Sequence, residues 1–440
     1  MVNTTPAFNL KVVLKETGIA ADTLRAWERR YGLPMPQRSA GGHRLYSQRD
    51  IETIKWLMKR QEDGLSISRA VDLWNEQMAS GTDPLADLVQ TTDTAAIPVP
   101  YQPSETLLDS LRAKWVEACL NFSESAAEQA LNQAFSLFPV EAVCVDVLQK
   151  GLSEIGKHWY ENRASVQQEH FASALAMRRL NALLSASPAP TRSQTVLVGC
   201  PPEELHTVTP LLLALLLRRR GLNVIYLGAN VPVDQLTTTV QDTQANLVAL
   251  VAQQLITAAT LQQTAQALSS RGIPVAFGGR IFSIQTELSA CIPGYFLGRD
   301  LTSALDQIDL LLNKKLKLPS LKAASTSYVT AHEAFVAQRG QIELTLKKSI
   351  EHFSLAPSNV QTGIYFLGEN IQAGLQLGDM SYVSAEVEWL KTLLQFHETQ
   401  PEQLIYFMQA YAAAVKKNLN GQGKLILEWL AGEVEKLRPG

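Results

Sequence analysis

Two histidines in the middle of this 440-residue chain stand close to carboxylates and could bind a metal ion or a cofactor. His206 follows Glu204 by two positions, and His170 directly follows Glu169, with nine residues between Trp159 and that pair. Neutral imidazole is a good ligand for transition metal ions, and a nearby carboxylate can orient its ring. The spacing predicts two parts of one ligand site, although a lone histidine can also cap a helix and a tryptophan can be core.

Residues near the amino end could bind nucleic acid. Arg25 and Arg29 are spaced i, i+4 and are followed by Arg30, so one helix face could meet phosphates and base edges together. The segment Gly41–Tyr46 then combines a glycine turn with polar and aromatic residues, which suits a wing whose tip approaches a DNA backbone. The alternative is that the arginines only solvate a helix face.

Periodic patterns predict the elements that position these residues. Leu10–Glu16 and Ala21–Tyr31 read as two helices with a glycine turn between them, and residues 104–186 read as a four-helix bundle. Short apolar runs then alternate with helical patterns, which predicts a doubly wound parallel sheet whose ligands bind at the carboxyl ends of its strands. The predicted strands are Thr195–Gly199, Asn223–Leu227, Leu247–Val251, Pro274–Phe277 and Tyr295–Leu297.

Beyond residue 321 only amphipathic helical patterns remain, for example over Ala334–Phe353, Ala385–Phe396 and Gln403–Leu419. The predicted fold is thus multidomain, α and α/β, and ends in an all-α domain. Its aromatic stripes favour an oligomerisation or protein-contact module. The expected domains are residues 1–78, a proline-rich linker over 79–103, the bundle over 104–187, the Rossmann-like sheet over 194–316 and the helical domain over 321–440.

Charge, hydropathy and cysteine content indicate the cellular compartment of the chain. The net charge of −3 is unevenly placed, because the first 75 residues hold 12 Lys and Arg against 8 Asp and Glu, a local excess of +4. The longest apolar run, Pro210–Leu217, is too short to span a bilayer, and no signal peptide follows Met1. Four cysteines lie far apart without a CxxC pair. We therefore expect a cytoplasmic protein with no membrane partner.

The amino-terminal motifs carry a family resemblance. Thr23–Tyr31, followed by Gly42–Tyr46 and Asp50-Ile51, resembles the winged helix-turn-helix of MerR-type transcription regulators. The resemblance implies that a recognition helix and a wing bind DNA, while Trp27 packs in the core. The implied DNA-binding residues are Arg25, Arg29 and Arg30 on the helix and His43, Arg44 and Tyr46 on the wing.

The middle of the chain carries a second resemblance. Glu204–Thr209 is similar to the acidic-x-His-x-x-Gly motif of the cobalamin-binding module of methionine synthase and its relatives, with Thr209 in place of the glycine. The Trp-x9-Glu-His motif that begins at Trp159 resembles the bundle of cobalamin-dependent photoreceptor regulators of the CarH/LitR type. Those proteins join a MerR-like domain, a four-helix bundle and a cobalamin-binding domain in the order seen here.

This resemblance implies His206 as the lower axial ligand to cobalt, with an upper, adenosyl side on the bundle. The other implied cofactor-binding residues are Trp159, Glu169 and His170 above, Glu204 and Thr207 beside the histidine, and Gly278 and Gly279 along the nucleotide tail. Two further positions depart from the family pattern. Tyr160 stands where light-responsive members have a histidine, and Val251–Gln254 holds no serine.

We expect a transcription regulator, not an enzyme, that binds double-stranded promoter DNA as a dimer or tetramer and responds to adenosylcobalamin and light. A cobalamin-dependent enzyme or carrier would need a catalytic domain for which little length remains. A further alternative keeps the fold but senses haem or a linear tetrapyrrole such as biliverdin, alone or together with cobalamin, through the bundle or the C-terminal helices. The last alternative for the chain is a protein-interaction module that binds no cobalamin.

Overall fold

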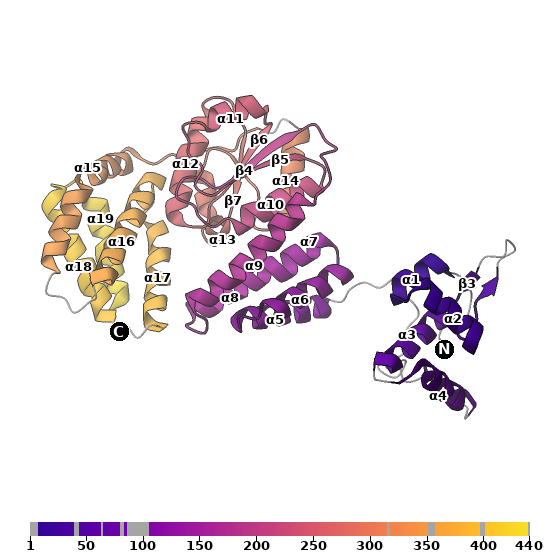
Figure 1. Ribbon diagram of the computed structural model, residues 1–440. Coiled ribbons are helices and arrows are strands. Elements are labelled where there is room, and N and C mark those ends of the chain that lie inside the picture. The colour runs from indigo at the N-terminus through magenta and orange to yellow at the C-terminus, as the bar shows by residue number, and fades with distance from the viewer. Residues whose placement is uncertain are drawn as a thin grey trace. The chain divides into compact units, whose positions relative to one another are not determined.

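A computed structural model describes residues 8–38, 44–62, 65–79, 83–85, 105–314, 317–350, 357–396 and 401–438. The chain divides into two compact units, residues 1–102 and residues 103–440, which are described separately. The predicted fold class is confirmed: the chain has a helix-turn-helix, a helical bundle, a parallel sheet and a helical C-terminal region (Figure 1). Among the described residues, no helix has both the length and the apolar character needed to cross a membrane.

The amino-terminal unit is a winged helix-turn-helix. Gly18 ends the first helix and Gly32 ends the second, and both adopt a left-handed conformation, with φ of 71° and 69°, that glycine tolerates without strain. Trp27 is buried in the core of this unit, as predicted. Its elements are β1 (Phe8–Asn9), α1 (Leu10–Thr17), α2 (Ala21–Tyr31), β2 (Gln37–Arg38), β3 (Arg44–Tyr46), α3 (Gln48–Glu62) and α4 (Ile67–Ala79), with the antiparallel order β1-β3-β2.

The second unit begins with the four-helix bundle. Its third helix starts as α7, passes through a π-helical segment over Val143–Gln149 and continues as α8. Gly151 lets this helix approach α5, because a Cβ at this position would lie 2.8 Å from the ring of Trp115. The helices are α5 (Glu105–Leu120), α6 (Glu124–Leu137), α7 (Val140–Ala142), α8 (Lys150–Tyr160) and α9 (Val166–Ser185).

A five-stranded parallel sheet follows, with the order β5-β4-β6-β7-β8. Its strands are β4 (Thr195–Gly199), β5 (Asn223–Gly228), β6 (Leu247–Val251), β7 (Val275–Gly278) and β8 (Tyr295–Phe296), so each predicted run overlaps a strand to within one residue at either end. The helices between them are α10 (Val208–Arg219), α11 (Leu236–Thr243), α12 (Leu255–Ser269), α13 (Arg280–Ile284) and α14 (Leu301–Asn313). A 3-10 turn covers Thr286–Cys291.

Helix α10 joins the bundle to the sheet. All residues of the apolar run Pro210–Leu217 are buried, in one core with side chains of the bundle and of the inner strands. An amphipathic helix buries only one face, whereas a helix that is apolar on all sides is enclosed on all sides. The run is therefore a buried connector, and it places the carboxyl ends of the strands next to the bundle.

The C-terminal helices form a second core that is continuous with the other face of the sheet, over α12 and α13. Helix α16 packs on α12 through Gln376, whose side-chain amide donates to the carbonyl of Ala259 at 2.7 Å. The sequence pattern indicated parts of α15, α17 and α18 but did not single out α16 or α19. The helices are α15 (Thr326–Ser349), α16 (Pro357–Leu377), α17 (Ser381–Phe396), α18 (Pro401–Asn418) and α19 (Lys424–Leu437).

Candidate functional site

The loop between β4 and α10 places His206 at the carboxyl edge of the sheet. The side chain of Glu204, 1% exposed, accepts hydrogen bonds from the backbone N–H of His206 at 2.9 Å and from its ring Nδ1 at 2.6 Å. An ionised carboxylate only accepts hydrogen bonds, so Nδ1 carries the proton. The imidazole side chain is 60% exposed, which leaves Nε2 as the nitrogen that could bind a metal ion.

Two more donors fix the second oxygen of Glu204. Its Oε2 accepts from the hydroxyl of Thr257 and from the backbone N–H of Gln253, each at 2.6 Å. Sequence reasoning missed Thr257 because it sought a serine within Val251–Gln254. The hydroxyl comes instead from the first turn of α12, and the signal for it was a buried threonine just inside the helix that follows β6.

The electrostatics of the pair favour the charged forms of both groups. Burial opposes ionisation of Glu204, but the hydrogen bonds from His206, Thr257 and the backbone outweigh it and lower the pKa of the carboxyl. The hydrogen bond to Glu204 raises the pKa of His206, against the effect of burial. The negative charge of Glu169 raises the pKa of His206 further, and the positive charge of Arg280 opposes this.

The bundle residues of the predicted upper side lie at the end of α8 and the start of α9. Trp159 is half-buried, and His170 is exposed with its Nδ1 2.8 Å from Oε2 of Glu169. The other oxygen of Glu169 accepts from the hydroxyl of Ser173 at 2.7 Å. Because the charge of Glu169 acts on His206, the start of α9 and the histidine loop share one electrostatic environment.

The remaining predicted cofactor contacts frame the same edge of the sheet. Thr207 connects the loop to the bundle, since its hydroxyl lies 3.8 Å from the sulfur of Met177 on α9. Gly279 has φ 125°, and a Cβ there would lie 1.9 Å from the carbonyl oxygen of Ala252, so only glycine fits. Gly278 is buried but less crowded, because a Cβ at this position would lie 3.9 Å from its nearest neighbour, Leu297.

The predicted DNA-binding arginines of α2 are all exposed. Arg25 forms a surface ion pair with Asp22 at 3.2 Å, and Arg29 and Arg30 lie in the last turn. His43 lies outside the described residues. The exposed arginines keep the one-face spacing that contact with a DNA backbone requires.

Tyr46, predicted to contact DNA from the wing, is not on the surface. Its side chain is fully buried, and its hydroxyl donates to Oε1 of Glu28 at 2.5 Å. Burial and this carboxylate raise the pKa of Tyr46 above its usual range. Arg44 donates through Nε to the other oxygen of Glu28 at 2.8 Å. Tyr46 is therefore a core residue that fixes β3 to α2, which does not support its predicted DNA contact.

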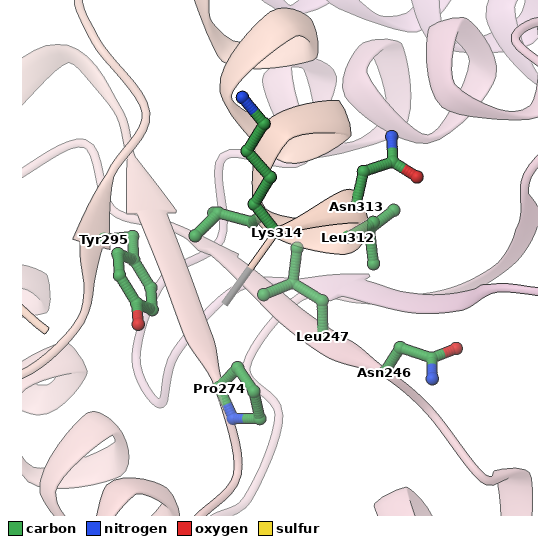
Figure 2. Close-up of a pocket in the computed structure, with 8 residues that line it drawn as sticks. Asn246, Leu247, Pro274, Tyr295, Leu312, Asn313 and Lys314 are labelled. Atoms are coloured by element: carbon green, nitrogen blue, oxygen red, sulfur yellow. The ribbon is translucent and has the colours of Figure 1, made fainter. Parts of the chain in front are cut away.

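A pocket of about 390 Å³ lies at the opposite edge of the sheet (Figure 2). Its lining includes Leu247, Pro274 and Tyr295, which stand at the amino ends of β6, β7 and β8, together with the end of α14. Ligands of parallel sheets bind at the carboxyl ends of the strands. The pocket is thus separate from the histidine loop and is not the candidate cofactor site.

Three family models match the chain. A MerR HTH family regulatory protein model matches residues 8–77, and B12 binding domain models match residues 111–184 and 194–303. Among solved structures, the monomethylamine corrinoid protein of Methanosarcina barkeri is similar with a TM-score of 0.38 and 15% identity, over 47% of this chain and 99% of that one.

Two relatives from Myxococcus xanthus align over most of their own length. The HTH-type transcriptional repressor CarH is 30% identical over 276 residues, which cover 62% of this chain and 88% of the repressor. The HTH-type transcriptional repressor CarA is 32% identical over 244 residues, which cover 55% of this chain and 75% of CarA. The chain therefore belongs to the family of MerR-type transcription regulators with B12-binding domains that includes CarH and CarA.

Proposed function

We propose that this chain is a cytoplasmic regulator that binds promoter DNA and senses adenosylcobalamin between its bundle and its parallel sheet. The observation that carries the proposal is the ring of His206, which buried Glu204 holds through Nδ1 while Nε2 stays available. Cobalt in cobalamin would take a neutral imidazole nitrogen as a protein ligand. A single oriented imidazole therefore fits this group.

His206 would hold the cobalt through Nε2, and Glu204 keeps the imidazole in the tautomer that can do so. Trp159, Glu169 and His170 line the adenosyl side. Thr207, Gly278 and Gly279 border the nucleotide tail, and the absence of a Cβ at Gly279 leaves the backbone there open to close approach.

Adenosylcobalamin, when bound, supplies a cobalt–carbon bond that light breaks. The chain's part would be to pack Trp159 and Glu169 against the adenosyl group, which would tie the end of α8 to the ligand. Release of a packed conformation shifts the population of assembled chains and so changes DNA affinity. Arg25, Arg29 and Arg30 bind DNA within a dimer or tetramer, because an operator with two half-sites requires two DNA-binding domains.

The test compares the full chain with adenosylcobalamin in the dark and after illumination, by size-exclusion chromatography and by binding to a DNA fragment selected from a random pool. We expect retained corrinoid, and a change in both oligomer size and DNA affinity after light. If no corrinoid is retained, the proposed ligand is wrong. If corrinoid is retained but size and DNA affinity stay the same, the light response is wrong while cobalamin binding stands.

One observation favours a second tetrapyrrole in the C-terminal helices. His332 Nε2 and the hydroxyl of Tyr411 are buried without a hydrogen-bond partner among the described residues, and burial lowers the pKa of His332. A neutral imidazole of this kind could bind haem iron or hydrogen-bond a bilin such as biliverdin. Titration of the full chain with haem and with biliverdin tests this. A new absorption band that His332→Ala removes supports the second site, and the lack of any band excludes it.

A further inference from the structure

Helix α17 of the C-terminal region contacts segments next to both halves of the candidate cobalamin site. Its residues Tyr382, Glu386 and Trp389 are spaced i, i+4 and i+7, which places them along one face of the helix. The face runs from the sheet to the end of α8. Figure 1 shows α17 as the C-terminal helix next to α8 and α13.

The first of these residues anchors α17 on the sheet side. The carbonyl of Tyr382 accepts from the side-chain amide of Gln285 at 3.0 Å, just after α13. The buried ring of Tyr382 reaches Cys291, with its hydroxyl 3.8 Å from the sulfur. This end of α17 is therefore fixed to the segment that follows Gly279.

The last of the three residues anchors α17 on the bundle. The rings of Trp389 and Tyr160 stack with centroids 5.9 Å apart and an interplanar angle of 20°, and the Tyr160 hydroxyl donates to the carbonyl of Trp389 at 3.2 Å. Phe366 of α16 also stacks on Trp389, at 6.4 Å. Tyr160 directly follows Trp159, so this contact fixes the position of the end of α8, which carries Trp159 of the proposed upper side.

Glu386 lies between these anchors with its hydrogen-bonding capacity unused. It is half-buried, and across the described parts of the chain its carboxylate has no hydrogen bond and no ion pair. Burial raises its pKa, and the positive charge of Arg280 opposes this only in part. Arg280 belongs to the same edge of the sheet as His206, because its backbone N–H donates to the side chain of Gln253 at 3.0 Å and the backbone N–H of Gln253 donates to Glu204 at 2.6 Å. Its oxygens are not among the buried polar atoms that lack a partner, so they reach the surface and can accept hydrogen bonds from donors of a ligand.

We propose that α17 is a third wall of the cobalamin site, in which Glu386 accepts hydrogen bonds from amide side chains at the corrin edge and Trp389 positions Tyr160 and Trp159 over the upper face. This inference rests on the proposed cobalamin binding. It gives the C-terminal helices a role in ligand affinity as well as in packing. Glu386 contacts the ligand, whereas Trp389 acts through its neighbours.

The first test measures the dissociation constants of adenosylcobalamin and hydroxocobalamin for the full chain, Glu386→Ala and Glu388→Ala. Glu388 is the matched control, on the same helix with a 66% exposed side chain. We expect Glu386→Ala to weaken both ligands about tenfold, the size of one hydrogen bond to a charged acceptor. Glu386→Gln, which still accepts, should restore part of the loss. If Glu386→Ala and Glu388→Ala bind like the wild-type chain, the contact is wrong.

The second test separates positioning from stability through the ratio of the two dissociation constants. Trp389→Leu loosens the upper face, so adenosylcobalamin should lose affinity several-fold relative to hydroxocobalamin, whose upper ligand is small. Tyr406→Leu, an exposed aromatic on α18, is the control and should keep the wild-type ratio. Tyr160→Phe removes only the hydroxyl contact and gives a milder variant if Trp389→Leu does not fold. An unchanged ratio in both Trp389→Leu and Tyr160→Phe overturns the positioning role.

Hydrogen exchange on the wild-type chain separates this inference from the proposed function. Adding hydroxocobalamin should slow amide exchange over α17 as well as in the histidine loop. Slower exchange in the loop alone means that cobalamin binds but α17 is no wall. If hydroxocobalamin does not bind at all, both the proposed function and the wall are wrong.

Discussion

Glu204 is a buried carboxylate whose hydrogen bonds come from three segments of the chain: its own loop, the end of β6 and the start of α12. Removing one partner of a buried charge leaves it partly unpaired, which costs more than the lost hydrogen bond itself. The orientation of His206 therefore depends on residues that do not touch the proposed ligand. Thr257 is the clearest of these.

Thr257→Val tests this dependence. The change removes the hydroxyl that Glu204 accepts from, at nearly constant volume, and we expect cobalamin affinity to fall by about tenfold because the carboxylate no longer fixes His206. The matched control is Thr264→Val on the same helix, where a buried hydroxyl donates to the carbonyl of Thr260 at 2.8 Å, away from Glu204. Equal affinities of the two variants, measured by titration, would contradict the positioning role of Thr257.

The titration of His206 provides a pH test without cobalamin. Its pKa is raised chiefly by Glu204, so the pair stabilises the fold below the unfolded pKa of about 6.5, and this contribution is lost as pH rises through the higher folded value. In Glu204→Gln the carboxylate charge is gone, and the folded pKa of His206 should fall. NMR titration of the imidazole C–H resonances, assigned with His206→Ala, measures it. A His206 pKa that does not change in Glu204→Gln would show that Glu204 is not the cause.

At the scale of elements, the strands were predictable and several contacts were not. A strand of a parallel sheet is buried on both faces, so Leu247–Val251 is an unbroken apolar run that the sequence displays directly. Tyr46 was misplaced because a tyrosine beside a glycine turn looks like a surface contact. Only the tertiary structure shows that Glu28, on helix α2, accepts a hydrogen bond from the hydroxyl of Tyr46.

Helix α2 carries the prediction for DNA binding. Arg25→Ala and Arg29→Ala should each weaken DNA binding about tenfold at moderate salt and reduce its dependence on salt concentration, because each arginine neutralises a phosphate or contacts a base edge. Arg69→Ala, an exposed arginine on α4, serves as the control. Fluorescence anisotropy over a range of salt concentrations measures both quantities. Affinities of Arg25→Ala and Arg29→Ala equal to that of Arg69→Ala would contradict recognition through α2.

At the scale of the whole molecule, buried α10 explains how the bundle and the sheet pack together in one core. Its apolar run was visible in the sequence, but a run of this kind does not reveal what encloses it. The same holds for the C-terminal helices, whose apolar stripes predicted a core without saying that it merges with the sheet over α12 and α13. Such contacts join residues far apart in sequence, so periodicity alone cannot supply them. The net charge of −3 is likewise an average that does not show the excess of +4 in the first 75 residues.

The most direct test of the central claim is the visible spectrum of hydroxocobalamin bound to the full chain and to His206→Ala. We expect the wild-type chain to give the spectrum of histidine-coordinated cobalt, and His206→Ala to lose this spectrum. His170→Ala, on the bundle side, should keep it. An identical spectrum for bound cobalamin in the wild-type chain and in His206→Ala would contradict the assignment of His206 as the lower ligand, and with it the proposed site.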